Sequence, residues 1–197
     1  MEAPTHYVEA TILPLDSAQL SGADISFATT AIMGCVHLAI VEGAEIAVSF
    51  PKMSSDEEVT TTGSVVRIFG SVLDLAKLLA RKDFASLNAG GMFRLGKESI
   101  RTVPADVKWE TYRRDRSVER SFDGFAAREA RRLEGKGRSE AWAARPKTRR
   151  EKLPFVTMKS ASTGENRFSI FIRRQEETSF ISGKPSTYGL GVSVPAF

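Results

Sequence analysis

The stretch from Leu153 to Ile172 reads Leu-Pro-Phe-Val-Thr-Met-Lys-Ser-Ala-Ser-Thr-Gly-Glu-Asn-Arg-Phe-Ser-Ile-Phe-Ile. Two apolar patterns typical of strands, Phe155–Met158 and Phe168–Ile172, flank a polar turn that contains Gly164. Short apolar runs on either side of a glycine-containing turn predict a β-hairpin. We expect this hairpin to organise the second half of the chain.

The turn of this hairpin is rich in hydroxyl groups, which belong to Ser160, Ser162 and Thr163. Hydroxyls can bind phosphates and ribose 2′-hydroxyls, and an aromatic side chain such as Phe168 can stack on a base. Serine, threonine and glycine are also ordinary turn residues. Local composition therefore leaves open whether the turn binds RNA or only closes the hairpin.

The basic residues are concentrated before the hairpin. Between Lys108 and Lys152 there are 15 lysines and arginines against 8 acidic residues, a net charge of +7, whereas the rest of the chain has 13 against 16, a net charge of −3. Basic charge confined to one segment is typical of a polyanion site. A solvated linker is the alternative.

Within this basic segment, Val107–Arg114 has the pattern of a strand, and Ser121 can cap a helix that ends near Glu134. Three arginines lie at helical spacing on one face of that helix, namely Arg128, Arg131 and Arg132. Such a face fits the groove of an RNA stem, where guanidinium groups reach phosphates on both strands.

The first half of the chain alternates strands and helices in the order β-α-β-β-α-β. The strands are predicted at Tyr7–Leu13, Glu45–Phe50, Ser64–Gly70 and Met92–Leu95, and the helices run from Asp24, as the cap, to Glu42 and from Val72 to Arg81. This order is that of the ferredoxin-like unit, which RNA-binding RRM domains share. Many unrelated functions use the fold, so the fold alone does not assign one.

The sequence thus predicts an α+β protein in two parts. Residues 1–104 would form a ferredoxin-like, RRM-like domain, and residues 105–197 a smaller part with the linker, the arginine-rich helix and the hairpin. The connections Lys52–Gly63 and Gln175–Ser186 are polar and are expected to be loops, and Thr187–Val194 is expected to be the final strand.

His37 is the candidate general base. Ile32, Val36 and Ala39 recur at helical spacing on the first predicted helix and indicate its buried face. His37 follows Val36, so it is expected at the edge of the core, with one ring nitrogen held and the other free. Imidazole titrates near neutral pH and suits proton transfer, although an isolated histidine on a helix is more often structural.

Composition excludes several classes of protein. No apolar run approaches the roughly 18 residues that a membrane-spanning helix needs, and the start lacks the pattern of a signal peptide. The single cysteine, Cys35, cannot form an internal disulfide, which fits a reducing cytoplasm. One cysteine and two histidines cannot build a common four-ligand zinc site, and no carboxylate cluster suggests a two-metal site. No metal or cofactor is expected.

Four motifs together resemble one known family. They are Ser160–Gly164, Phe168–Arg173, Tyr188–Leu190 and Val194–Phe197, and the front half agrees through His6-Tyr7, the histidine late in the first helix and Ile46–Pro51. The resemblance is to the CRISPR repeat-RNA endoribonuclease of type I-F systems, and it covers nearly the whole chain. It is weakest between about Gly135 and Arg150.

The resemblance implies roles for three catalytic residues. His37 matches the catalytic histidine of the family, and Ser160 matches a serine that anchors the 2′-hydroxyl of the RNA. Tyr188 matches a tyrosine beside the histidine that orients the histidine or the RNA, with core packing as the alternative. The acid that protonates the leaving oxygen stays open between Lys159 and water.

The resemblance also implies RNA contacts. Ser162 and Thr163 match residues at the cut, and Phe168 matches the aromatic that stacks on the base pair closing the stem. Arg114, or alternatively Arg113, matches an arginine that reads a guanine, a base that suits the guanidinium fork. Where the family form has a glutamine that reads an adenine, this chain has Arg116, which favours guanine or phosphate. Nonspecific phosphate contact is the alternative for all of these arginines.

The predicted function is that of a metal-independent endoribonuclease. It would bind the CRISPR repeat stem-loop, cut at the 3′ base of the stem by 2′-hydroxyl attack, and keep the product hairpin. The expected partners are this RNA and the other Cas proteins of a type I-F Cascade complex, with no membrane; the isolated protein is expected to be a cytoplasmic monomer. A noncatalytic stem-loop-binding module is the main alternative, and a DNA-binding regulator is disfavoured because no helix-turn-helix pattern is seen.

Overall fold

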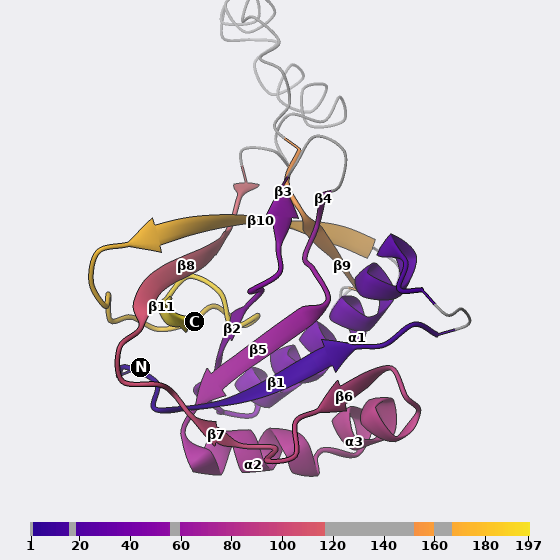
Figure 1. Ribbon diagram of the computed structural model, residues 1–197, viewed down its shortest axis with the longest axis horizontal. Coiled ribbons are helices and arrows are strands. Elements are labelled where there is room, and N and C mark those ends of the chain that lie inside the picture. The colour runs from indigo at the N-terminus through magenta and orange to yellow at the C-terminus, as the bar shows by residue number, and fades with distance from the viewer. Residues whose placement is uncertain (1, 16–18, 56–59, 117–151, 160–166) are drawn as a thin grey trace, which may run out of the picture.

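The fold is α+β, as the sequence predicts, and its described residues form two main antiparallel sheets, a small two-stranded sheet and a layer of helices (Figure 1). The computed structural model describes residues 2–15, 19–55, 60–116, 152–159 and 167–197. The predicted helix from Ser121 to Glu134 lies outside these residues.

The first sheet has the strand order β2-β5-β1-β6, and β7 also pairs with β1. All its pairs are antiparallel. The strands are β1 (His6–Ile12), β2 (Ala47–Ser49), β5 (Val65–Gly70), β6 (Phe93–Leu95) and β7 (Arg101–Thr102). The alternation of β1 is confirmed, because Val8, Ala10 and Ile12 are all buried.

Three helices accompany this sheet, and α1 lies behind β1 and β5 in Figure 1. They are α1 (Gly22–Val41), α2 (Val72–Ala80) and α3 (Lys82–Ala89). The prediction that Asp24 caps α1 is wrong by three residues. Ser21 is the cap: its hydroxyl accepts from the Asp24 N–H at 3.1 Å, and its own N–H donates to the Asp24 carboxylate at 2.9 Å. This reciprocal pair is a capping box.

Helix α1 is apolar on nearly all sides. Its inner face, with Ile32 and Val36, is buried in the core, whereas Phe27, Leu38 and Val41 are exposed. Within the described residues, α1 has the length and composition that would allow a helix to cross a membrane, with a mean hydropathy of 1.6. The expectation that no such stretch exists is therefore wrong by this measure. A core helix passes the same test.

The second sheet has the strand order β11-β8-β10-β9 and is antiparallel. Its strands are β8 (Lys108–Arg114), β9 (Phe155–Lys159), β10 (Arg167–Glu177) and β11 (Ser193–Ala196). The predicted hairpin is confirmed as the β9–β10 pair, in which Phe168 lies opposite Met158. The rest of the turn, residues 160–166, lies outside the described residues.

Several predicted boundaries are wrong. Strand β10 continues to Glu177, where a loop was expected, because residues 175–177 pair with β8. The last strand begins at Ser193 instead of Thr187, because Gly189 and Gly191 have φ values of +73° and +96° that end extended structure. The loop expected at Lys52–Gly63 contains a small pair of strands, β3 (Ser54–Ser55) and β4 (Thr60–Thr61). Helix α3 was not predicted.

Both sheets contribute to one continuous core. Val8, Ile32 and Ile68 from the first part belong to the same buried cluster as Ile170 and Leu190 from the second. The division at residue 104 and the ferredoxin-like assignment remain predictions. What the fold provides is a junction, where α1 meets the second sheet.

Candidate functional site

His37 lies at this junction with one ring nitrogen fixed. Its Nδ1 is 2.8 Å from the main-chain carbonyl oxygen of Thr187, which is 150 positions away in the chain. A carbonyl oxygen only accepts hydrogen bonds, so Nδ1 must carry the proton. In the neutral ring, Nε2 then has a free lone pair. A histidine in this tautomer can act as a general base through Nε2.

An aromatic row extends from this histidine. The ring of Tyr188 stacks on that of His37 with centroids 4.7 Å apart and an angle of 17° between the planes. Phe168 meets Tyr188 edge-on at 6.3 Å, and the Arg114 guanidinium lies 5.6 Å from the centre of the Phe168 ring. We call His37, Tyr188, Phe168 and Arg114 the aromatic row. The row joins α1, the 186–190 turn, β10 and β8.

Arg113 and Arg114 point to opposite faces of β8, because neighbouring strand residues alternate. Arg114 faces the aromatic row, whereas the Arg113 guanidinium lies 3.5 Å from the Glu177 carboxylate. Arg116 is exposed. Of the two candidate base-reading arginines, Arg114 is thus the one that lies against Phe168 in the aromatic row.

Strand β8 is locked in place by a buried carboxylate that sequence reasoning missed. Glu110 is 2% exposed and accepts from the Tyr112 hydroxyl at 2.7 Å and from Arg174 Nε at 2.6 Å. Burial, together with the Glu110 charge, raises the pKa of Tyr112 well above its ordinary value, so the phenol stays neutral. Arg174 lies opposite Tyr112 in the β8–β10 pair, and this cross-strand register, which the sequence does not show, is needed to recognise its contact with Glu110.

The remaining predicted site residues cannot be placed relative to His37 and the aromatic row. Six of them lie outside the described residues, namely Arg128, Arg131, Arg132, Ser160, Ser162 and Thr163. Their roles remain predictions. The two strand ends that flank the hydroxyl-rich turn are described, and the outermost described pair is Lys159 with Arg167. Phe168, a member of the aromatic row, is the next residue along β10.

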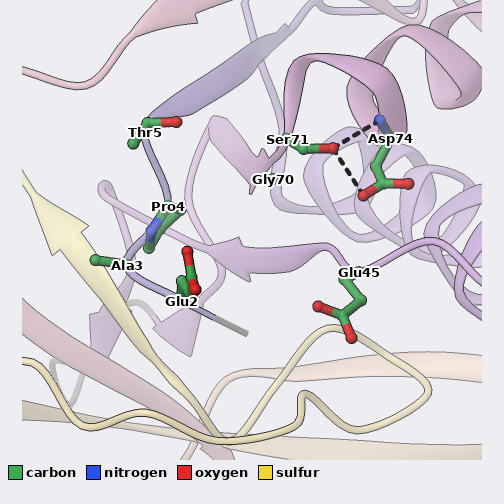
Figure 2. Close-up of a pocket in the computed structure, with 8 residues that line it drawn as sticks. All are labelled: Glu2, Ala3, Pro4, Thr5, Glu45, Gly70, Ser71 and Asp74. Atoms are coloured by element: carbon green, nitrogen blue, oxygen red, sulfur yellow. Dashed lines mark hydrogen bonds between the residues drawn. The ribbon is translucent and has the colours of Figure 1, made fainter.

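A cavity of about 520 Å³ lies elsewhere, near the N-terminal segment and the start of α2 (Figure 2). It contains none of the predicted site residues. Its lining consists of Glu2, Ala3, Pro4, Thr5, Glu45, Gly70, Ser71 and Asp74. Three of these residues are acidic, so the cavity disfavours RNA phosphates. Asp74 is already occupied as the partner of the Ser71 cap.

The second histidine, His6, and the single cysteine, Cys35, show no contact with the aromatic row among the described residues. His6 is half-buried, with Nδ1 2.9 Å from the Thr5 hydroxyl. Cys35 is buried, and burial raises the pKa of its thiol to about 11, which keeps it protonated. In the described ranges, no three histidine, cysteine or acidic side chains gather as metal ligands would.

The site thus combines a histidine in a fixed tautomer, a stacked aromatic ring and an arginine, on an α+β fold. Such groups are suited to RNA recognition and to proton transfer. A family model described as CRISPR-associated protein (Cas_Csy4) matches residues 7–197. The chain belongs to this family, the type I-F endoribonucleases that process CRISPR repeat RNA. The resemblance seen in the sequence is thereby confirmed. No curated protein matches the chain.

Proposed function

We propose that this protein is a metal-independent endoribonuclease that cuts the CRISPR repeat at the 3′ base of its stem. One observation carries the proposal: the Thr187 carbonyl holds the Nδ1–H tautomer of His37. The other ring nitrogen is then a proton acceptor. The imidazole stacks on Tyr188, which matches a tyrosine that orients the histidine or the RNA, and Tyr188 contacts Phe168, which matches the aromatic that stacks on the closing base pair. Membership of a family that processes CRISPR repeat RNA supplies the substrate class.

The reaction needs only groups of the chain and of the RNA. His37 Nε2 accepts the proton of the 2′-hydroxyl next to the scissile phosphate. The 2′-oxygen forms a bond to phosphorus, and the bond to the 5′-oxygen breaks. An acid, either Lys159 or water, protonates the leaving oxygen. The products are a 2′,3′-cyclic phosphate and a 5′-hydroxyl, so no metal is needed to create the nucleophile.

The other residues position the RNA. Ser160 anchors the 2′-hydroxyl, and Ser162 and Thr163 contact the sugar-phosphate at the cut. Phe168 stacks on the base pair that closes the stem. Arg114, with Arg113 as the alternative, reads the guanine, because its guanidinium lies against Phe168, the residue proposed to stack on the stem. The arginine-rich helix, with Arg128, Arg131 and Arg132, holds the phosphates of the stem.

Slow, single-turnover cleavage fits an enzyme that keeps its RNA product as part of a larger complex. One histidine without a second assigned acid suits an enzyme that cuts once and keeps its product. The product hairpin stays bound as the 3′ handle of the guide RNA, in a cytoplasmic Cascade complex with other Cas proteins. The isolated protein is a monomer. The strand order β2-β5-β1-β6 of the first sheet supports a ferredoxin-like, RRM-like domain as its platform.

The test is a cleavage assay with a cognate repeat hairpin in EDTA. Wild type is compared with His37→Ala, and with wild type acting on RNA that has a 2′-deoxyribose at the cut. We expect one cut ending in a 2′,3′-cyclic phosphate. Both changes should abolish this cut and leave binding largely intact. Tight binding without any cut by the wild type would instead identify a noncatalytic stem-loop-binding module.

A further inference from the structure

The turn from Ser186 to Leu190 is built around one serine. The Ser186 hydroxyl accepts from the N–H groups of Tyr188 and Leu190 at 3.4 and 3.2 Å. Its N–H donates to the Leu190 carbonyl at 2.8 Å, and its carbonyl accepts from the Gly189 N–H at 2.9 Å. Every polar group of Ser186 therefore closes the turn. Thr187, whose carbonyl binds His37, lies inside this closed loop.

The same turn is fixed to both sheets. The Val48 N–H donates to the Gly189 carbonyl at 2.9 Å, which attaches the turn to β2. The Gly191 N–H donates to the Tyr112 carbonyl at 2.8 Å, which attaches it to β8. Gly189 has a φ of +73°, and a Cβ there would lie 2.8 Å from Val48 Cγ2. The close approach to β2 is thus possible only for glycine.

We propose that the Ser186–Leu190 turn is the element that sets the tautomer of His37, with Ser186 and Gly189 as its positioning residues. The turn holds a main-chain acceptor, the Thr187 carbonyl, in line with Nδ1, and it places the Tyr188 ring on the imidazole. Neutral imidazole in water exchanges between two tautomers. Only the Nδ1–H form has its acceptor at Nε2. The functional consequence rests on the proposed role of His37 as the base.

The tautomer is directly measurable, because the chain has only two histidines. Long-range proton–nitrogen correlation spectra of the ¹⁵N-labelled full chain distinguish a protonated ring nitrogen from a free one. The spectra are recorded at about pH 8.5, above the range where imidazole usually titrates. The His37→Ala variant assigns the signals. We expect a protonated Nδ1 in wild type, and a protonated Nε2 or an even mixture would overturn the proposal without any variant.

Variants then test the cause. Ser186→Ala should give a mixture of tautomers and reduce the single-turnover cleavage rate by up to about tenfold, less than the roughly 10²–10⁴-fold that a general base contributes, because part of the population keeps the reactive tautomer. RNA affinity should stay unchanged. Ser186→Thr keeps a hydroxyl and should restore both. Ser182→Ala changes an exposed serine of the same loop and should have no effect.

Gly189→Ala has its own control. Gly191 also has a positive φ, +96°, but a Cβ there would meet nothing within 4 Å. Both substitutions strain the backbone, and only Gly189→Ala pushes the turn away from Val48. We expect mixed tautomers and slower cleavage for Gly189→Ala alone. A slower rate with an unchanged His37 spectrum in Ser186→Ala and Gly189→Ala would overturn the proposal.

The spectra test the positioning role of the turn, and the cleavage assay tests the proposed function, so either claim can be contradicted without the other. A fixed Nδ1–H tautomer in a protein that never cuts RNA would contradict the proposed function and leave the positioning role intact. Cleavage that depends on His37 in a protein with the other tautomer would contradict the positioning role alone.

Discussion

Two substitutions of Tyr188 test the role of the aromatic row. Tyr188→Phe removes only the hydroxyl, whereas Tyr188→Ala removes the ring as well. The ring contacts His37 on one side and Phe168 on the other. The hydroxyl has no hydrogen-bond partner among the residues that the structure describes. If Tyr188 orients the histidine, the ring alone matters. Tyr188→Phe should then cleave RNA within about twofold of wild type, since both ring contacts remain.

The cost of Tyr188→Ala follows from the two contacts that it removes. Aromatic pairs of this kind contribute about 0.5–1.5 kcal/mol each, so the two contacts supply at most about 1–3 kcal/mol for holding the imidazole. Since about 1.4 kcal/mol corresponds to a tenfold change in rate, the single-turnover cleavage rate should fall by about 5-fold to about 150-fold. His37 keeps its bond to the Thr187 carbonyl, so some activity should remain.

The assay measures single-turnover cleavage and RNA affinity for wild type, Tyr188→Phe and Tyr188→Ala. An orienting role predicts that Tyr188→Ala lowers the rate and leaves the affinity unchanged. Two results would refute this reasoning. Equal losses in Tyr188→Phe and Tyr188→Ala would show that the hydroxyl acts on the RNA. A loss of affinity in Tyr188→Ala with a normal rate would make the ring a binding contact.

Three further perturbations have defined outcomes. Arg67→Ala, which removes a guanidinium 2.7 Å from Glu9 and 4.1 Å from the Phe197 ring, should lower the free energy of unfolding in urea by about 2–4 kcal/mol, whereas the exposed Arg94→Ala should not. Burial opposes ionisation of Glu9, but hydrogen bonds and charge from Arg67 and Arg101 outweigh it and lower the pKa of Glu9 below its ordinary value. The Glu9 part of the stabilisation is therefore lost as the pH falls into the acid range, and the difference between the two proteins should narrow there. Arg131→Ala with Arg132→Ala should reduce the slope of log affinity against log salt by about two, unlike the equally charged change of Lys82 and Lys97 to alanine. Ser160→Ala should slow cleavage far more than it weakens binding, and equal losses would make Ser160 a contact residue only.

Elements with a strong local pattern could be predicted from the sequence. The alternation in β1 and the paired apolar runs of β9 and β10 each specify which side chains are buried. Helix α3 lacks such a signal. Its buried anchor is Phe84, which packs against Phe93 of β6 at 5.0 Å. That contact depends on the tertiary fold, and a short polar helix with one buried anchor cannot be recognised without it.

The candidate site was only partly accessible to sequence reasoning. The helical pattern placed His37 at the edge of the core, and the resemblance supplied Tyr188 as its neighbour. The group that fixes the imidazole is a main-chain carbonyl of Thr187. A carbonyl is present at every position, so no residue type marks it. The one residue type that marks this turn is Gly189, whose positive φ brings the turn against β2. A glycine in the sequence does not show which strand it will approach, so the contact could not be predicted.

Under the proposed function, the aromatic row would link stem recognition to proton transfer. Phe168, proposed to stack on the closing base pair, contacts Tyr188, which in turn stacks on the imidazole of His37. A stem that docks on Phe168 therefore ends beside the ring pair that orients the base. Since the 2′-hydroxyl must lie in line with the scissile phosphate, the cut is expected at the nucleotide next to the docked base pair. Geometry at the end of the stem would then select the scissile bond, while the arginines supply most of the affinity.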